Sequence, residues 1–349
     1  LMTLAEIGRT QKGGVGRLAL TDLDREARDL FAGWCRDAGC TVTVDAIGNV
    51  IARRPGRDPS RAPVATGSHL DSQPLGGRFD GAYGVMAGLE VVRALNDAGI
   101  ETAAPIEVID WTDEEGARFA AGCIGSAVFA GIRPLEQALA LTDADGKMLG
   151  DELRRIGYAG NAAPARPLAA YFEAHIEQGP ILEKNAVPIG AVLGAQGQRC
   201  FMVTVTGVEG HAGTLPMTER KDAFVGAAKM AVALNELAFS YQPNPVITVG
   251  HVRVGPNSRN TIPGTTVFSI DSRHPDEAIL QRMQSDMVRM IEGIADDIGL
   301  GIAIETVTIS APVHFDLSCV EAVREAAGTL GIPCQDIYSG AGHDACKVA

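Results

Sequence analysis

Between residues 63 and 193, short apolar runs typical of strands alternate with segments whose apolar residues recur at helical spacing. The runs that predict strands in the first part of the chain are 41–44, 49–52, 63–67, 105–111, 171–176 and 188–193. The helical patterns are 21–38, 84–98 and a helix that starts at 125–130. We therefore predict an α/β fold with a mixed, largely parallel sheet flanked by helices. Ligands of such folds collect at the carboxyl ends of the strands.

A second block of elements interrupts this pattern. In chain order it comprises strand 201–206, helix 223–238, strand 246–254, strand 265–272, helix 277–298 and strand 302–308. This βαββαβ order predicts a small open-faced sandwich that is inserted into the larger domain. A helix at 317–330 then returns to the larger domain. We assign residues 1–197 and 311–349 to the larger domain and residues 198–310 to the insert.

Composition argues against several classes of protein. The formal net charge is −13 and no run is rich in Lys and Arg, so nucleic acid is not an expected partner. No apolar stretch approaches the roughly 18 residues that span a membrane. The seven cysteines are scattered without a CxxC pair, which predicts reduced thiols and a cytoplasmic protein. The start has no signal-peptide layout, and we expect that residues precede Leu1.

Polar residues come directly after the predicted strands. His69 lies in the segment GSHLDS, where it could bind a metal while Asp71 holds its ring. A polar surface histidine is the alternative. Asp80 lies in a loop that opens onto a helix, which it could cap. Its carboxylate could instead bridge two metals, and the residues alone leave both alternatives open.

The segment DWTDEEG ends the predicted strand 105–111 and is more informative. Three acids crowd together there, namely Asp113, Glu114 and Glu115. Like charges this close raise one another's pKa values unless a cation is present. A solvated loop could also carry them. With a cation, Glu115 would be a metal ligand and Glu114 would be the general base that takes a proton from water at the metal.

Further candidates follow later strands. His175, in the segment HIEQG, is a candidate metal ligand, and Gln178 is a candidate hydrogen-bonding group for a substrate. In the second block the candidates are His211, Asn260 and Arg273. The alternatives for these three are a surface histidine, a turn asparagine and a salt-bridged arginine. If all three grouped near one pocket, they would offer oxyanion donors and a clamp for a carboxylate.

Taken together, a set of motifs resembles the hydantoinase/carbamoylase group of amidases. The motifs are GSHLDSQPLGGRFDGAYGV, DWTDEEGARF, HIEQGPILE, GHAGT-PM--R-DA, SRNTIPG, DSRHP and SGAGHDA. They cover essentially the whole chain in the order of this family, which has the metallopeptidase fold of aminoacylases. The resemblance therefore implies a metallopeptidase-like catalytic domain in residues 1–197 and 311–349. It makes the segment 198–310 a lid and dimerisation domain.

The resemblance also implies a role for each candidate residue. Two divalent metals are expected, zinc foremost and otherwise manganese, cobalt or nickel, with Asp80 bridging them. The residues that match the family's ligands are His69, Asp80, Glu115 and His175, and Glu114 matches the catalytic base. In the lid, the residues that match those polarising the scissile carbonyl and binding the substrate carboxylate are His211, Asn260 and Arg273. In relatives the equivalent of His211 reaches the active site of the partner subunit, so a homodimer through the lid is implied.

The implied activity is hydrolysis of the carbamoyl C–N bond of N-carbamoyl-amino acids or N-carbamoyl-β-alanine, which releases the amino acid, ammonia and carbon dioxide. The Ser-Gln-Pro after Asp71 resembles β-ureidopropionase-like members. Allantoate and N-acyl amino acids are alternative substrates, and a non-catalytic binding or dimerisation module is the alternative of another class. Relatives continue beyond SGAGHDA to a fifth metal ligand. His343 holds a different family position, so either further residues follow Ala349 or the second metal site lacks a ligand, and we expect further residues.

Overall fold

The chain forms two compact units in the computed structural model, which describes residues 1–242 and 245–349. Unit 1 comprises Leu1–Ile189, Asp316–Cys334 and His343–Ala349. Unit 2 comprises Gly190–Phe315 and Gln335–Gly342. The boundaries of the lid at 198–310 stay a prediction, since these units divide the chain elsewhere. No helix of the described ranges combines the length and the apolar character that crossing a bilayer requires.

Unit 1 is built on a mixed sheet with the strand order β1-β2-β4-β3-β5. Its strands are β1 (Thr41–Val44), β2 (Val50–Arg54), β3 (Val64–His69), β4 (Ile106–Trp111) and β5 (Ala170–Phe172). Its helices are α1 (Asp22–Asp37), α2 (Ala82–Asp97), α3 (Ile124–Phe129), α4 (Leu135–Leu139), α5 (Leu149–Ile156), α6 (Ile181–Asn185), α9 (Leu317–Thr329) and α10 (Ala345–Val348), with a 3-10 turn at Leu4–Glu6. Strand β3 runs parallel to β4 and β5, whereas the pairs β1–β2 and β2–β4 are antiparallel. The predicted α/β class with a mixed sheet is confirmed.

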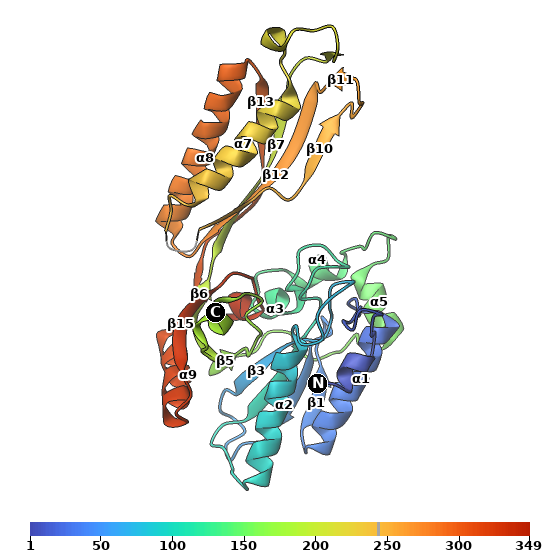
Figure 1. Cartoon of the computed structure of the whole chain (residues 1–349). Helices are drawn as coiled ribbons and strands as arrows, with labels where there is room; N and C mark the ends of the chain where they lie inside the picture. The colour runs from blue at the N-terminus through green and yellow to red at the C-terminus, as the bar shows by residue number, and fades with distance from the viewer. Residues whose placement is uncertain (243–244) are drawn as a thin grey trace. The chain divides into compact units, whose positions relative to one another are not determined.

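Helices cover both faces of this sheet. Alternate residues of a strand point to opposite faces, so each strand contributes side chains to two cores. Helices α1 and α2 lie along one face of the sheet (Figure 1). The core on that side contains side chains of β2 and β4 together with those of the two helices, namely Phe31, Val50, Ala52, Val85, Leu89 and Val108. The opposite core contains Ile51, Ala65, Ile109, Trp111 and Phe129 of α3. The sheet is therefore buried between helices, and its strand ends are the places where polar side chains collect.

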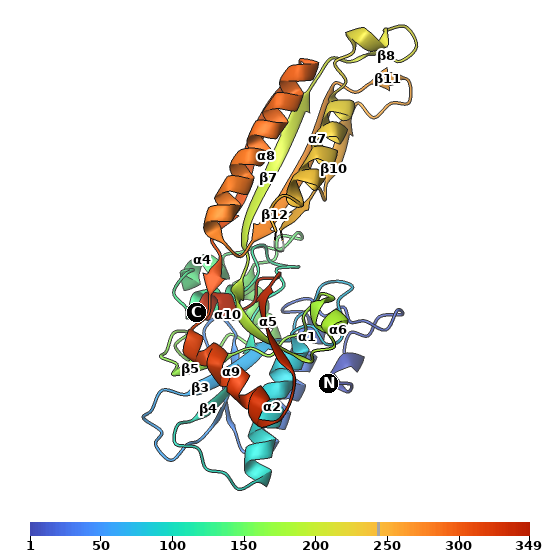
Figure 2. The same ribbon diagram turned by 60° about the vertical axis from the view of Figure 1, so that its left-hand side comes forward.

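Unit 2 contains an antiparallel sheet with the order β10-β12-β7-β13, to which β9 adds by pairing with β12. The strands are β6 (Ile189–Ala195), β7 (Gly197–Thr206), β8 (Gly210–His211), β9 (Val246–Thr248), β10 (Val252–Gly255), β11 (Thr261–Ile262), β12 (Thr265–His274), β13 (Gly301–Ser310), β14 (Val313–His314) and β15 (Cys334–Ser339). The helices are α7 (Ala223–Ala238) and α8 (Glu277–Ile298), with a 3-10 turn at Met217–Glu219. Both helices pack on one face of the sheet (Figure 2). The other face bears polar side chains, among them Gln198, Asp271 and Arg273.

Two strand predictions are wrong in part. The predicted strand 171–176 ends at Phe172. The carboxylate of the next residue, Glu173, accepts hydrogen bonds from the Ser68 hydroxyl at 2.6 Å and the Ala345 amide at 2.8 Å. The predicted strand 246–254 is two strands, β9 and β10. Between them, the His251 amide donates to the Ser269 hydroxyl at 3.0 Å, which interrupts the ladder with β12. Both departures lie next to contacts with partners that are distant in sequence.

Candidate metal centre

His69, Asp80 and His175 lie together in unit 1, with potential ligand atoms within 4.8 Å of one another. His69 is the last residue of β3, and His175 follows the neighbouring parallel strand β5. Parallel strands deliver residues at their carboxyl ends to the same edge of a sheet. Asp80 precedes α2, and its Oδ1 lies 3.2 Å from His175 Nε2. This is the arrangement that the sequence predicted for three of its four metal ligands.

Each member of this group is oriented by a second contact. His69 Nδ1 lies 2.9 Å from the backbone oxygen of Asp71, and His175 Nδ1 lies 3.0 Å from that of Ile176. A ring nitrogen that donates to a carbonyl leaves Nε2 with a lone pair for a metal. Gln178 Nε2 donates to Asp80 Oδ2 at 2.7 Å. Asp71 therefore holds His69 through its carbonyl, and Oδ1 of the carboxylate that we predicted lies 3.7 Å from the same ring nitrogen.

Gly81 allows the His69 ring to lie against the backbone. Its φ is +61°, and a Cβ there would lie 2.4 Å from the ring atoms Cε1 and Nε2 of His69. Both the backbone conformation and the space require glycine. In the segment Phe79-Asp80-Gly81, the glycine therefore leaves room for the His69 imidazole.

The two glutamates of the DEE run have different environments. Glu114 is 8% exposed, and its Oε2 lies 3.4 Å from His69 Nε2. Its other oxygen, Oε1, accepts from Cys123 Sγ at 3.4 Å. The Glu115 carboxylate instead accepts from the amide and side chain of Gln73, at 3.3 and 2.8 Å. The structure thus brings Glu114 to the group but not Glu115, whose role as a ligand stays a prediction.

The carboxylate of Asp71 organises this run. Its two oxygens accept the backbone amides of Glu114 and Glu115, each at 3.2 Å. Burial raises the pKa of Asp71 to about 6 and that of Glu114 to about 7. Burial acts against the charged ring of His69, but the carboxylates of Glu114 and Asp71 raise its pKa to about 10. Asp71 therefore shapes the DEE turn and adds negative charge beside His69.

The site fits a divalent cation. Burial opposes ionisation of Asp80, yet its hydrogen bond with His175 lowers the pKa of Asp80, so the carboxylate is charged. Two imidazoles and a carboxylate are a donor set suited to zinc and related transition metals. Buried acids near His69 are the environment in which a cation is most favourable.

The motifs did not assign roles to several residues at the site. The His343 ring lies 4.2 Å from that of His175, and burial lowers its pKa to about 3, which keeps it neutral. Asp344 is fully buried and accepts a hydrogen bond from Ser126. The SGAGHDA motif pointed to both residues, because it places His343 next to Asp344. The spacing of residues alone did not show which side chains these two contact.

The lid candidates separate into two places within unit 2. The strands β8 and β11 pair His211 with Thr261, and the Ala212 amide donates to the Asn260 carbonyl at 3.0 Å. Arg273 lies near the far end of β12, which begins at Thr265. At about 3.3 Å per residue, the strand carries Arg273 about 26 Å from Thr265. Within unit 2 of one chain, His211 and Asn260 therefore do not share a pocket with Arg273.

Comparisons with known proteins identify the family. Residues 65–349 match the model of peptidase family M20/M25/M40. The chain belongs to this family. Among its relatives, the N-carbamoyl-L-amino-acid amidohydrolase of Rhizobium meliloti is 47% identical over 350 residues, covering 100% of this chain and 84% of the relative. The allantoate amidohydrolase of Bacillus subtilis is 32% identical, covering 98% of this chain and 84% of the relative.

A solved structure extends the comparison to the fold. The hydantoinase/carbamoylase family amidase from Burkholderia multivorans superposes on this M20 chain with a TM-score of 0.97 and 56% identity, covering 100% of this chain and 85% of that one. The resemblance that the motifs indicated is confirmed. Members of the M20 family are metal-dependent hydrolases, so this chain is a metal-dependent hydrolase.

Proposed function

We propose that the chain hydrolyses the carbamoyl C–N bond of N-carbamoyl-L-amino acids and releases the amino acid, ammonia and carbon dioxide. The observation that carries this proposal is the buried Glu114 carboxylate, 3.4 Å from Nε2 of His69 at the group of metal-ligating side chains. The 47% identity to an N-carbamoyl-L-amino-acid amidohydrolase supports the substrate class. N-carbamoyl-β-alanine belongs to the same class. Allantoate is the second candidate, supported by the 32% identity to an allantoate amidohydrolase.

The proposed cofactor is a pair of divalent metals, zinc foremost and otherwise manganese, cobalt or nickel. The proposed ligands are His69, Asp80, Glu115 and His175. Asp80 is proposed to bridge the pair, and Glu115 contacts Gln73 in this structure. When bound, the metals would supply the Lewis acidity that activates water and polarises the scissile carbonyl.

The chain's own residues move the protons and hold the substrate. Glu114 takes a proton as water attacks the carbamoyl carbon, because a pKa of about 7 suits both uptake and release near neutral pH. It then gives this proton to the departing amino nitrogen as the C–N bond breaks. The carbamate that remains decomposes to ammonia and carbon dioxide. Cys123 holds Oε1 of Glu114, so that Oε2 is the oxygen directed to the metal-ligating group.

Unit 2 is proposed to supply the remaining groups. Arg273 would bind the substrate carboxylate, and His211 and Asn260 would stabilise the oxyanion. Gln178 is proposed to contact the substrate as well, besides its hydrogen bond to Asp80. These roles follow the family motifs and go beyond the contacts within one chain.

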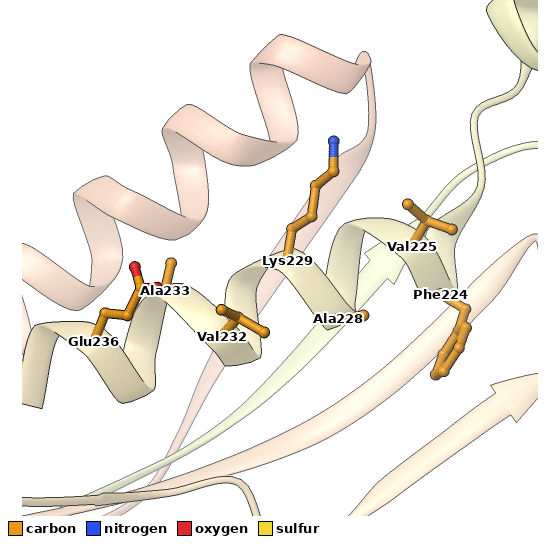
Figure 3. A pocket seen from close by; sticks show the side chains of 7 residues that line it. All are labelled: Phe224, Val225, Ala228, Lys229, Val232, Ala233 and Glu236. Atoms are coloured by element: carbon orange, nitrogen blue, oxygen red, sulfur yellow. The ribbon is translucent and has the colours of Figure 1, made fainter.

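A homodimer through unit 2 is part of the proposal. Arg273 lies about 26 Å along β12 from Thr265, and His211 lies in the β8–β11 pair that precedes β12 along the chain, so a second copy would have to supply one of the two to a small substrate. Helix α7 also exposes the apolar side chains of Phe224, Val225 and Val232, with Lys229 and Glu236 among them (Figure 3). Contiguous exposed apolar side chains typically mark an interface. The proposed location is the cytoplasm, which the seven free cysteines support.

The direct test is ammonia release from a panel of substrates. The protein would be loaded with zinc, manganese or cobalt and given several N-carbamoyl-L-amino acids, N-carbamoyl-β-alanine and allantoate. We expect the highest kcat/KM with an N-carbamoyl-L-amino acid. A higher value with allantoate would establish the second candidate, and no release from any substrate would reject the proposed activity.

A further inference from the structure

Asp271 and Arg273 lie on the face of the unit 2 sheet that α7 and α8 leave uncovered. Residues two apart on a strand point to the same side, and Ser272 between them is buried. The side chains of Asp271 and Arg273 are 34% and 32% exposed. Gln198 of β7 lies opposite Arg273 in the register of the antiparallel pair. These three side chains therefore share one patch that solvent can reach.

Hydrogen bonds hold the guanidinium of Arg273 on two sides. Nε donates to Asp271 Oδ1 at 3.0 Å, and Nη2 donates to Oδ2 at 2.8 Å. Nη1 donates to the Gly340 carbonyl at 2.9 Å. Gln198 Nε2 donates to Oδ2 of Asp271 at 2.9 Å, which fixes the carboxylate in turn. The plane of the guanidinium is thus set by contacts within unit 2.

The contacts leave a defined part of the guanidinium for another partner. Arginine has five N–H donors, of which the described residues take three, so one N–H remains on each terminal nitrogen. Two such donors match the two oxygens of a carboxylate. We propose that Asp271 and Gln198 are positioning residues, which hold Arg273 so that these two N–H groups bind the substrate carboxylate. This inference rests on the proposed function, in which Arg273 is the clamp.

Two physical consequences follow from the arrangement. A free arginine side chain populates many rotamers, and ordering it on binding opposes affinity. Asp271 and Gly340 remove that cost before the substrate arrives. Asp271 also offsets the charge of Arg273, so the clamp distinguishes anions by the alignment of hydrogen bonds more than by attraction at a distance. The loss of Asp271 should therefore affect substrates with a carboxylate selectively.

The test compares an N-carbamoyl-L-amino acid with its amide, in which a carboxamide replaces the carboxylate. For Asp271→Ala of the metal-loaded protein, we expect KM for the acid to rise about tenfold or more, as for loss of hydrogen bonds to a charged group. We expect little change in kcat and in the constants for the amide, which is measured both as substrate and as competitive inhibitor. Gln198→Leu should act in the same direction more weakly. In an Arg273→Ala background, Asp271→Ala should cause no further loss.

Asp286→Ala is the matched control, because it removes an aspartate that pairs with Arg289 on α8 of the same unit. It should leave both substrates unchanged. Equal losses on the acid and the amide, unchanged KM in Asp271→Ala, or losses that add to those of Arg273→Ala would overturn the inference alone. A wild-type protein that releases no ammonia from any panel substrate would overturn the proposed function and this inference with it.

Discussion

Replacing Gly81 with alanine tests the packing that places His69 at the metal centre. The backbone at Gly81 has a φ of +61° and a ψ of −51°, which an L residue rarely adopts. The added Cβ would lie 2.4 Å from two atoms of the His69 ring, far inside van der Waals contact. Because His69 is only 1% exposed, the ring has no solvent to move into. Either the ring or the start of α2 must shift.

The expected size of the effect has two parts. Strained backbone costs about 1–3 kcal/mol, and an overpacked site costs about 1–3 kcal/mol more. Their sum predicts that the free energy of unfolding falls by about 2–6 kcal/mol, which lowers the melting temperature by roughly 4–24 °C in a domain of this size. A displaced His69 also leaves the metal with one ligand fewer. Metal affinity should therefore fall by at least the 10–100-fold that is typical when a ligand's supporting contacts are lost.

Two measurements separate these effects. Thermal unfolding of the metal-free protein in chelator reports the strain, and competition with a chelating dye reports metal affinity. Gly77→Ala is the control in the same loop, because its Cβ would meet only Cβ of Asp80, at 4.0 Å. If Gly81→Ala unfolds at the same temperature as Gly77→Ala and binds metal as tightly as wild type, the packing of His69 on Gly81 does not matter and the reasoning fails.

Four further predictions concern the same chemistry. Glu114→Gln should retain bound metal and lose about 10²–10⁴-fold in kcat; unchanged turnover would remove Glu114 from the role of base. Arg273→Lys should raise KM for substrates with a carboxylate, because lysine cannot make a two-pronged contact; an equal loss on the amide would count against the clamp. Ser126→Ala should lower the free energy of unfolding by about 1–3 kcal/mol in urea titrations, because it leaves the buried Asp344 without that donor; an unchanged value would show that another group compensates. Dialysis against a chelator should abolish activity and lower the melting temperature, and two metals per chain should restore both; restoration by one metal would contradict the proposed pair.

The helices of unit 2 were predictable because their signals are local. The predicted bounds 223–238 and 277–298 are those of α7 and α8. Each helix begins after an aspartate whose side chain accepts amides of the first turn, Asp222 for α7 and Asp276 for α8. Apolar residues then recur at helical spacing against the sheet. Nothing from outside these segments is needed to place their ends.

The strand ends were harder to predict because their partners are distant in sequence. Strand β5 ends at Phe172, and the side chain of the next residue, Glu173, binds Ser68 and Ala345, which are far from it along the chain. The apolar pattern through residue 176 does not predict the contacts with Ser68 and Ala345. Hydrophobic periodicity reports which face of a segment is buried, but it does not report where the backbone leaves a ladder.

At the metal centre the sequence predicted which residue types meet, but not which atoms. His69, Asp80 and His175 come together as expected because parallel strands end at one edge. Nδ1 of His69 lies 2.9 Å from the Asp71 carbonyl oxygen and 3.7 Å from the carboxylate oxygen Oδ1. In this structure the carboxylate satisfies the amides of the DEE turn, which leaves the carbonyl for the ring. A sequence motif specifies the type of a residue, whereas the donors and acceptors around that residue determine which of its atoms make hydrogen bonds.

The DEE run shows how a correct expectation can have a different cause. From the sequence, crowding of like charges was the reason to expect raised pKa values. In the structure, burial is the largest cause of the raised pKa of Glu114, and His69 opposes it before Asp71 adds to it. The difference matters for the chemistry. A base whose pKa is raised mainly by a neighbouring carboxylate loses that shift when a cation neutralises the neighbour, whereas a shift caused by burial persists as long as the pocket stays dry. A cation at the metal-ligating group would lower the pKa of Glu114, so the rise caused by burial is what keeps this pKa above the ordinary value of a glutamate when the neighbouring acids are neutralised.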